Sequence, residues 1–497
     1  CDLDPPASAC TEHLAAMGRF IDDSEGSPAK RSRILNESDA DLQQAEVTAA
    51  RLCRVATRGP VGATAGVGAV LRKDGVRALR SRAGQLEQTV VLGGACSEVF
   101  SGPRLARVLR PAVEHQNQAL KDLAASAACS PLSIHTSVGV PPSLGPFIEA
   151  LAAHLPWSRE CDDWFVNLQI EGTTAVWAGV EALMRLREVD APSGPPRRYV
   201  AVAEVSYHGP KTTGLGQPAE PRWPGAPRTQ GQLPYPLPSP DAAGSQEERE
   251  RFLQRFDAFL AEHGEQTGVI IFEPQWGSSF AARPWPKDLL QEAVRRSRAK
   301  GILVLCDEIM CGLGRHGQGT LFLSRAWELR PDAVTFGKAV AGGVYPMSGV
   351  ALRRGAASLS AAGVKMAQSH TYAGSSALAL STAREVLSEL PNWFQHAADM
   401  GRVVEEILKP VSGKDFLEIQ GLGLMWGGLF TDPDKDRRQR AQDLLTKACE
   451  DGGVWPYFVP AGGFMLTPPM DVGEEELRLG LERLASCLAR VKEELTA

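Results

Sequence analysis

Short apolar runs recur through the middle of the chain, and each ends in a polar or glycine-rich turn. They lie at residues 164–170, 199–205, 269–272, 302–306 and 333–336. Continuous apolar runs of this length are typical of strands that are covered on both faces of a sheet. Residues 175–187 have a helical pattern instead. Because strand and helix patterns alternate, the sequence predicts an α/β fold.

The chain ends and one internal segment have different patterns. Residues 1–55 are polar, with acidic and basic residues by turns, and we expect a weakly ordered N-terminal extension. Residues 221–241 are crowded with proline, which predicts a long irregular loop that could cover a site. From Leu477 to Leu495, apolar residues recur at steps of three and four after the acidic run 474–476. This spacing predicts an amphipathic helix whose apolar side packs in the core.

Composition narrows the class of protein. The chain has 497 residues, 43% of them hydrophobic and 23% charged, which is ordinary for a globular protein of two or three sub-domains. The net charge of -6 is mild, and no basic stripe or long apolar run occurs, so we expect neither nucleic acid nor a membrane as a partner. Ten cysteines are too sparse for a disulfide-stapled domain, and buried or incidental thiols in a reducing compartment fit better.

We therefore expect a soluble protein of the cytoplasm or of an organelle lumen. Because the chain begins at Cys1 and not at Met, a processed product or a piece of a longer polypeptide is an open alternative.

Suggestive groups follow the first two predicted strands. In an open α/β sheet, ligands bind beyond the carboxyl ends of the strands. The first strand runs into Gly172, Thr173 and a helical pattern, and backbone amides at such a helix start can hold a phosphate. The second ends in Tyr207 and His208, an aromatic ring and an imidazole that could contact a planar cofactor. A helix cap for the threonine and a half-buried strand end for the tyrosine are the plainer alternatives.

The other three strands end in two acids and a lysine. Glu273 is either structural or guides a substrate amine or water. Asp307 directly follows an apolar strand, where a carboxylate is costly unless it is paired. No companion ligand stands at metal spacing, so we expect another kind of cation and no metal. Lys338, followed by glycines, is placed for Schiff-base chemistry, which needs an amine that can lose its proton. Together these groups are what pyridoxal phosphate requires.

With these motifs the chain resembles the class III aminotransferases, the ornithine/4-aminobutyrate type of the fold-type I pyridoxal phosphate enzymes. The resemblance covers roughly residues 90–470 and is carried by EGTTA from Glu171, YHG from Tyr207, EP from Glu273, DEIMCGLGRHG from Asp307, FGKAVAGGVYP from Phe336 and HTYAGSSALA from His370. It implies a large domain with a mostly parallel central sheet flanked by helices, and a smaller α+β domain from both chain ends. The implied divisions are an extension at 1–55, small-domain segments at 56–130 and 386–497, and the large cofactor-binding domain at 131–385.

The resemblance also implies roles for the residues that match the family motifs. Lys338 would form the Schiff base with the cofactor and then move a proton, and Asp307 would hold the pyridinium. Tyr207 would stack on the ring or touch its edge. Gly172 and Thr173 would bind the phosphate.

Three further residues receive implied roles. His208, within the YHG motif, would belong to the cofactor site, and Glu273 would lie on the substrate side. Thr371 would complete the phosphate cradle of a neighbouring subunit, which implies a homodimer.

The implied reaction is the transfer of an amino group between an amine or amino acid and an oxo acid or aldehyde. A racemase, decarboxylase or aminomutase on the same fold, and an inactive scaffold relative, are the alternatives. Met310 stands where the family usually has Gln, so it cannot hydrogen-bond the phenolic oxygen of the cofactor. Met465 stands where many relatives have an Arg for the substrate α-carboxylate. These departures predict no ordinary preference for glutamate or 2-oxoglutarate.

Overall fold

A central sheet of seven strands organises the larger part of the described chain. The computed structural model describes residues 90–93, 96, 99–125, 139–157, 163–194, 196–209, 231–364, 374 and 376–496. The sheet consists of β2 (Phe165–Gln169), β3 (Tyr199–Ala203), β4 (Gln232–Tyr235), β5 (Thr267–Phe272), β6 (Leu303–Asp307), β7 (Ala333–Phe336) and β8 (Ser348–Leu352). Their order is β2-β8-β7-β6-β5-β3-β4, and only β8 runs antiparallel to its neighbours. The five predicted strands and the α/β class are confirmed.

The apolar strands are buried because helices cover both faces of this sheet. Along β5, Val269 and Ile271 pack on one face with the helix that follows β2. Ile270 and Phe272 alternate with them and pack on the opposite face. Because successive side chains point to opposite faces and both faces are covered, residues 269–272 are apolar at every position. The covering helices are α8 (Gly172–Asp190) on the first face and α9 (Gln246–His263) and α10 (Lys287–Ala299) on the second.

The proline-rich segment is more regular than expected. Residues 232–235 form β4, which pairs in parallel with β3, so the prediction of an irregular loop across 221–241 is wrong there. The strand accommodates Pro234 because β4 lies at the edge of the sheet, where a missing N–H group costs no ladder bond on the open side. The neighbouring 3-10 helix η1 spans Pro240–Ala243.

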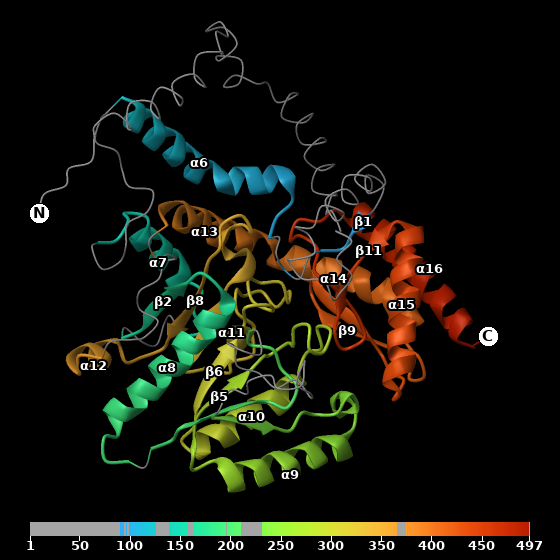
Figure 1. The fold of residues 1–497 in the computed structure, drawn as a ribbon, viewed down its shortest axis with the longest axis horizontal. Helices are drawn as coiled ribbons and strands as arrows, with labels where there is room; N and C mark the ends of the chain where they lie inside the picture. The colour runs from blue at the N-terminus through green and yellow to red at the C-terminus, as the bar shows by residue number, and fades with distance from the viewer. Residues whose placement is uncertain are drawn as a thin grey trace, which may run out of the picture. The chain divides into compact units, whose positions relative to one another are not determined.

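A second, antiparallel sheet lies in the C-terminal part of the chain. Its strands are β9 (Leu417–Leu422), β10 (Met425–Phe430), β12 (Tyr457–Val459) and β13 (Gly463–Leu466), in the order β12-β13-β10-β9. The helices α14 (Phe394–Leu408), α15 (Lys435–Gly452) and α16 (Glu474–Thr496) gather beside β9 (Figure 1). A short strand near the described N-terminal end, β1 (Val90–Val91), pairs with β11 (Val454–Trp455). Both ends of the described chain therefore contribute to this α+β region.

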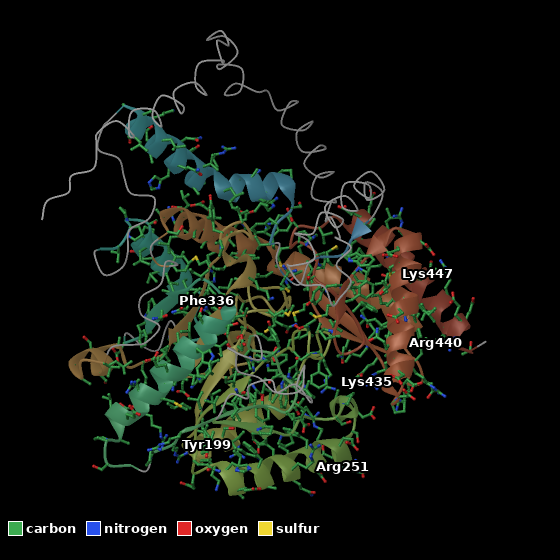
Figure 2. The ribbon with its side chains drawn as sticks, in the orientation of Figure 1. Tyr199, Arg251, Phe336, Lys435, Arg440 and Lys447 are labelled. Carbon is green, nitrogen blue, oxygen red and sulfur yellow. The ribbon has the colours of Figure 1, made fainter. Side chains whose placement is uncertain are left out.

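The predicted C-terminal helix is confirmed as α16, and the leucines of the predicted stripe are buried at Leu477, Leu481, Leu484 and Leu488. Leu495, the last residue of the predicted stripe, is exposed instead, because it lies in the last turn of the helix. In Figure 2, Lys435, Arg440 and Lys447 lie along α15, where all three are exposed, whereas Phe336 is buried in the central region.

The remaining helices pack around the central sheet. They are α6 (Gly102–Ala124), α7 (Leu144–Ala152), α11 (Leu323–Ala326), α12 (Ala356–Ala361) and α13 (Ala377–Glu389), with 3-10 helices η2 (Lys338–Ala341), η4 (Leu390–Trp393) and η5 (Lys409–Val411). Helix α13 contacts both α6 and α7. Across the described residues, no helix combines the length and apolar character needed to cross a membrane. The described cysteines are buried free thiols, as expected: Cys96, Cys306, Cys311, Cys449 and Cys487.

Candidate active site

The carboxyl ends of five strands meet at one edge of the central sheet. β2, β3, β5, β6 and β7 point in the same direction, so the residues that follow them converge. A cavity of about 530 Å³ opens there. Its lining includes every predicted site residue that the structure describes: Gly172, Thr173, Tyr207, His208, Glu273, Asp307 and Lys338. Thr371 and the divisions predicted for residues 1–55 lie outside the described residues.

The acid of the site is Asp307, the last residue of β6. Its Oδ2 lies 2.6 Å from Nδ1 of His208, and its Oδ1 accepts a hydrogen bond of 2.8 Å from the hydroxyl of Thr335. The backbone N–H of Ile309 donates a third bond to the carboxylate. Burial alone would raise the pKa of Asp307, but these hydrogen bonds and the imidazole hold it below its usual value. Asp307 is therefore an ionised carboxylate inside the cavity.

The imidazole partner is buried more completely than the acid. His208 is 3% exposed, and burial favours its neutral form. The hydrogen bond and the charge of Asp307 outweigh burial and raise the pKa of His208 above its usual value. Thr335, one strand away from Asp307, was missed by the sequence reasoning, because nothing local shows that β7 pairs with β6 at this register.

The N-terminus of α8 faces the same cavity. The N-cap residue Glu171 makes no side-chain cap, so the first-turn amides lack a side-chain acceptor among the described residues. A Cβ atom on Gly172 would lie 2.8 Å from Cδ1 of Ile309. A Cβ atom on Gly209, which has a φ of +119°, would lie 2.3 Å from Oγ1 of Thr173. Glycines at these two positions let the strand ends approach closely and leave the helix start open to an anion.

Lys338 stands at the end of β7 in an uncommon backbone conformation. Its φ is +51°, in the left-handed region that costs a non-glycine residue about 1–3 kcal/mol. The next three residues, Ala339 to Ala341, are buried, whereas the side chain of Lys338 is exposed at the cavity. Packing of the following turn therefore holds the strained lysine in place.

Glu273 lies deeper in the cavity wall, after β5. It is 7% exposed, and its Oε2 accepts a 3.0 Å hydrogen bond from the backbone N–H of Gly277. Within the part of the chain that the structure describes, its buried Oε1 has no hydrogen-bond partner. Burial is the largest cause that raises the pKa of Glu273; with the further rise from Asp307 and the opposing effect of His208, the net pKa is about 7.

One wall of the cavity is apolar and rich in sulfur. Met465 is fully buried in a cluster with Cys96, Ala281, Ala282, Cys311, Met425 and Val459. Met310 and Tyr457 pack against this cluster and also line the cavity. Among the described lining residues, Lys338 and His208 are the only basic side chains, and no arginine is present. Sequence reasoning identified both methionines but missed Tyr457, which arrives from the C-terminal sheet.

These groups fit pyridoxal phosphate chemically. The cavity volume lies in the ordinary range for small-molecule sites. An open helix start suits the phosphate, an ionised carboxylate suits a pyridinium, and an exposed amine suits an aldehyde. A buried oxygen without a partner, on Glu273, indicates that the cavity is built for a polar occupant.

Comparisons with known proteins agree with this picture. The profile of the family Aminotransferase class-III matches residues 112–488. The ornithine aminotransferase of Saccharomyces cerevisiae is 29% identical over 231 residues, covering 45% of this chain and 53% of the relative. The 4-aminobutyrate aminotransferase GabT of Escherichia coli is 28% identical over 242 residues, with 46% and 54% covered. The chain thus spans about half the length of these curated relatives.

A solved structure covers more of the chain. The omega-transferase from Vibrio fluvialis JS17 is 18% identical, has a TM-score of 0.67, and is matched over 82% of this chain and 96% of its own. This likeness shows the same fold, including the mostly parallel sheet.

Proposed function

The chain belongs to the class III aminotransferase family, and we propose that it transfers an amino group between an amine or amino acid and an oxo acid or aldehyde, with pyridoxal phosphate as cofactor. One observation carries the proposal: an amine, an ionised acid and an open helix start converge on one cavity, at Lys338, Asp307 and Gly172. The cofactor is that of the family. When bound, it withdraws electrons from the bonds of the carbon that carries the substrate nitrogen.

Asp307 and His208 set the charge at the pyridine end. The carboxylate of Asp307 would favour a protonated pyridine nitrogen by charge attraction, which is strong in this buried place. His208 keeps Asp307 ionised through the 2.6 Å contact, and Thr335 fixes the orientation of the carboxylate. His208 and Thr335 are therefore positioning residues that act through Asp307.

Lys338 supplies the reacting amine. Its Nζ is the amine that would bind the aldehyde of the cofactor, and it would also be the group that takes up and gives back the proton at the reacting carbon of the substrate. Gly172 and Thr173 would bind the phosphate at the start of α8, and Tyr207 would lie against the ring. The strained backbone at Lys338 supports this role, because such strain concentrates at functional sites.

The test is a spectrum followed by a donor panel. Purified protein mixed with pyridoxal phosphate should gain a visible absorbance band. Addition of an amine donor should remove this band, and addition of an oxo acceptor should restore it. Loss of donor chirality without any oxo product would indicate a racemase instead. No visible band at saturating cofactor would contradict the proposal.

Donors should be favoured when they carry no carboxylate next to the reacting carbon. The described lining has the acids Glu171, Glu273 and Asp307 but no arginine, and Met465 is buried in an apolar cluster. A lost charge-assisted pair should lower kcat/KM for an α-amino acid roughly 10- to 100-fold relative to the matching amine. Steady-state kinetics with matched pairs measure this ratio. A strong preference for L-glutamate contradicts the expectation.

We also propose that the protein is a homodimer that completes this site. The HTYAG motif with Thr371 implies the second subunit, and exposed apolar residues on α6 support it: Val113, Leu120 and Leu123 are 44%, 52% and 66% exposed. These positions, seven and three residues apart, form one apolar stripe along the helix. At the cavity, Ile170 and Tyr207 are exposed as well.

Light scattering at micromolar concentration should give the mass of a dimer. Leu120→Glu should raise the dimer dissociation constant about 10- to 100-fold, because a leucine buried at the interface is replaced by a charge. Leu479→Glu, at a similarly exposed leucine on α16, is the matched control and should leave the mass unchanged. A monomer that turns over at full rate would contradict this proposal.

A further inference from the structure

Glu273 has a carboxyl oxygen, Oε1, to which no group of the described residues completes a hydrogen bond, although the backbone amide of Tyr207 lies close enough to lower the pKa of the carboxyl. Oε2 accepts the hydrogen bond from Gly277, but Oε1 is buried inside the cavity wall with no partner. Among the described residues that line the cavity, no other side chain has a buried nitrogen or oxygen without a partner. A buried oxygen left unpaired is costly, so a bound ligand is expected to supply its partner.

The surroundings of Glu273 bring its pKa close to neutral pH, so that the protonated carboxyl is well populated at pH 7 and dominates below it. Burial, together with the negative charge of Asp307 on β6, raises the pKa of Glu273, and the net value is about 7. The imidazole of His208 and the amides of Gly277 and Tyr207 oppose the rise. The neighbouring Tyr235 and Cys311 add no charge, because burial raises their pKa values well above the usual range. Lys338 lines the same cavity and is the remaining basic group there.

Pyridoxal phosphate has four polar points, and three already have partners. The phosphate, the pyridine nitrogen and the aldehyde fit the start of α8, Asp307 and Lys338 in turn. The fourth is the phenolic oxygen, which lies across the aldehyde carbon from the phosphate arm. A partner for it must donate a hydrogen bond, because this oxygen carries negative charge when the aldehyde is condensed with an amine.

Met310 and Glu273 are the side chains that meet beside Gly277. A Cβ atom on Gly277 would lie 2.6 Å from Sδ of Met310 and 3.5 Å from Oε2 of Glu273. A thioether has no hydrogen to donate. A protonated carboxyl has one, so of these two side chains Glu273 is the one that can donate.

We propose that Glu273 contacts the cofactor directly, its protonated carboxyl donating a hydrogen bond from Oε1 to the phenolic oxygen of pyridoxal phosphate. This inference rests on the proposed function. It gives Glu273 a different partner from the substrate-side role that the family resemblance implies. It also explains how the site holds the phenolic oxygen although residue 310 is a methionine.

A thermodynamic cycle that combines a substitution at Glu273 with removal of the phenolic oxygen from the cofactor tests the contact. Dissociation constants are measured by equilibrium dialysis for pyridoxal phosphate and for 3-deoxypyridoxal 5′-phosphate, which lacks only the phenolic oxygen. Relative to the wild-type protein, Glu273→Leu should weaken binding of pyridoxal phosphate about 10- to 100-fold. It should weaken binding of the deoxy analogue about threefold or less. Glu273→Gln keeps an N–H donor and should retain most of the coupling. Equal losses for both cofactors would overturn the proposal.

A matched control and an optical readout separate the possible failures. Glu171→Leu makes the same change at another lining carboxyl and should weaken both cofactors to the same extent. The infrared difference spectrum between the loaded protein and Glu273→Gln should show the carbonyl band of a protonated acid at pH 6; an ionised carboxylate there would overturn the proposal. If wild-type protein binds neither cofactor, the proposed function fails. If it binds both and no coupling appears, only the assignment of Glu273 fails.

Discussion

Replacing Lys338 with alanine should abolish turnover while leaving a folded protein that still binds pyridoxal phosphate. The variant loses the covalent anchor and the proton carrier together, and no other lysine lines the described cavity. The phosphate cradle at Gly172 and Thr173 and the carboxylate of Asp307 remain. Cofactor should therefore be retained but leave on dialysis, and the visible band of the wild type should be missing.

The measurement is single-turnover absorbance with the best amine donor, beside a circular dichroism spectrum. Lys447→Ala, on the outer side of α15 (Figure 2), removes a lysine far from the cavity and should turn over at the wild-type rate. Alanine keeps the steric limits of a non-glycine residue at this left-handed position, so the change tests the amine and not relief of backbone strain. A small alkylamine added to Lys338→Ala should restore part of the proton transfer. Wild-type turnover by Lys338→Ala would show that the site is assigned wrongly.

Asp307→Asn should lower the rate of the chemical step by about two to four decades without preventing cofactor binding. The amide keeps the shape of the side chain but removes the charge opposite the pyridine nitrogen. Breaking a buried ion pair costs roughly 3–5 kcal/mol, which corresponds to this range if it is felt mainly in the transition state. His208 loses the interaction that raises its pKa, so burial should leave it neutral at pH 7.

Asp332 provides the matched control for this change. It is as buried as Asp307, at 7% exposed, but it pairs with Arg353 and accepts a hydrogen bond from the backbone of Val304. Asp332→Asn should lower the melting temperature and spare the rate constant of the remaining folded enzyme. Asp307→Asn should show the opposite pattern, with a larger effect on the rate constant than on the melting temperature. A loss of less than about tenfold in Asp307→Asn would mean that the carboxylate does not act on the cofactor.

The sequence by itself determined the strands and the residues that follow them. A strand covered on both faces is apolar at most positions, as Ala333, Val334 and Phe336 are, so residues 333–336 were recognisable as β7 without any partner strand. A polar group directly after such a strand lies at the sheet edge, which is why Asp307 and Lys338 could be predicted to share one site. Both signals are local, since they depend only on neighbouring positions along the chain.

Only the tertiary structure decided which groups satisfy one another. Thr335 reaches Asp307 because β7 pairs with β6 at one register, and Met465 joins Cys96 and Cys311 because segments far apart in the sequence pack together. Likewise, no local pattern shows that Oε1 of Glu273 lacks a partner. The physical reason is that strand order, register and side-chain packing follow from long-range contacts, whereas hydrophobic periodicity reports only whether a face is buried.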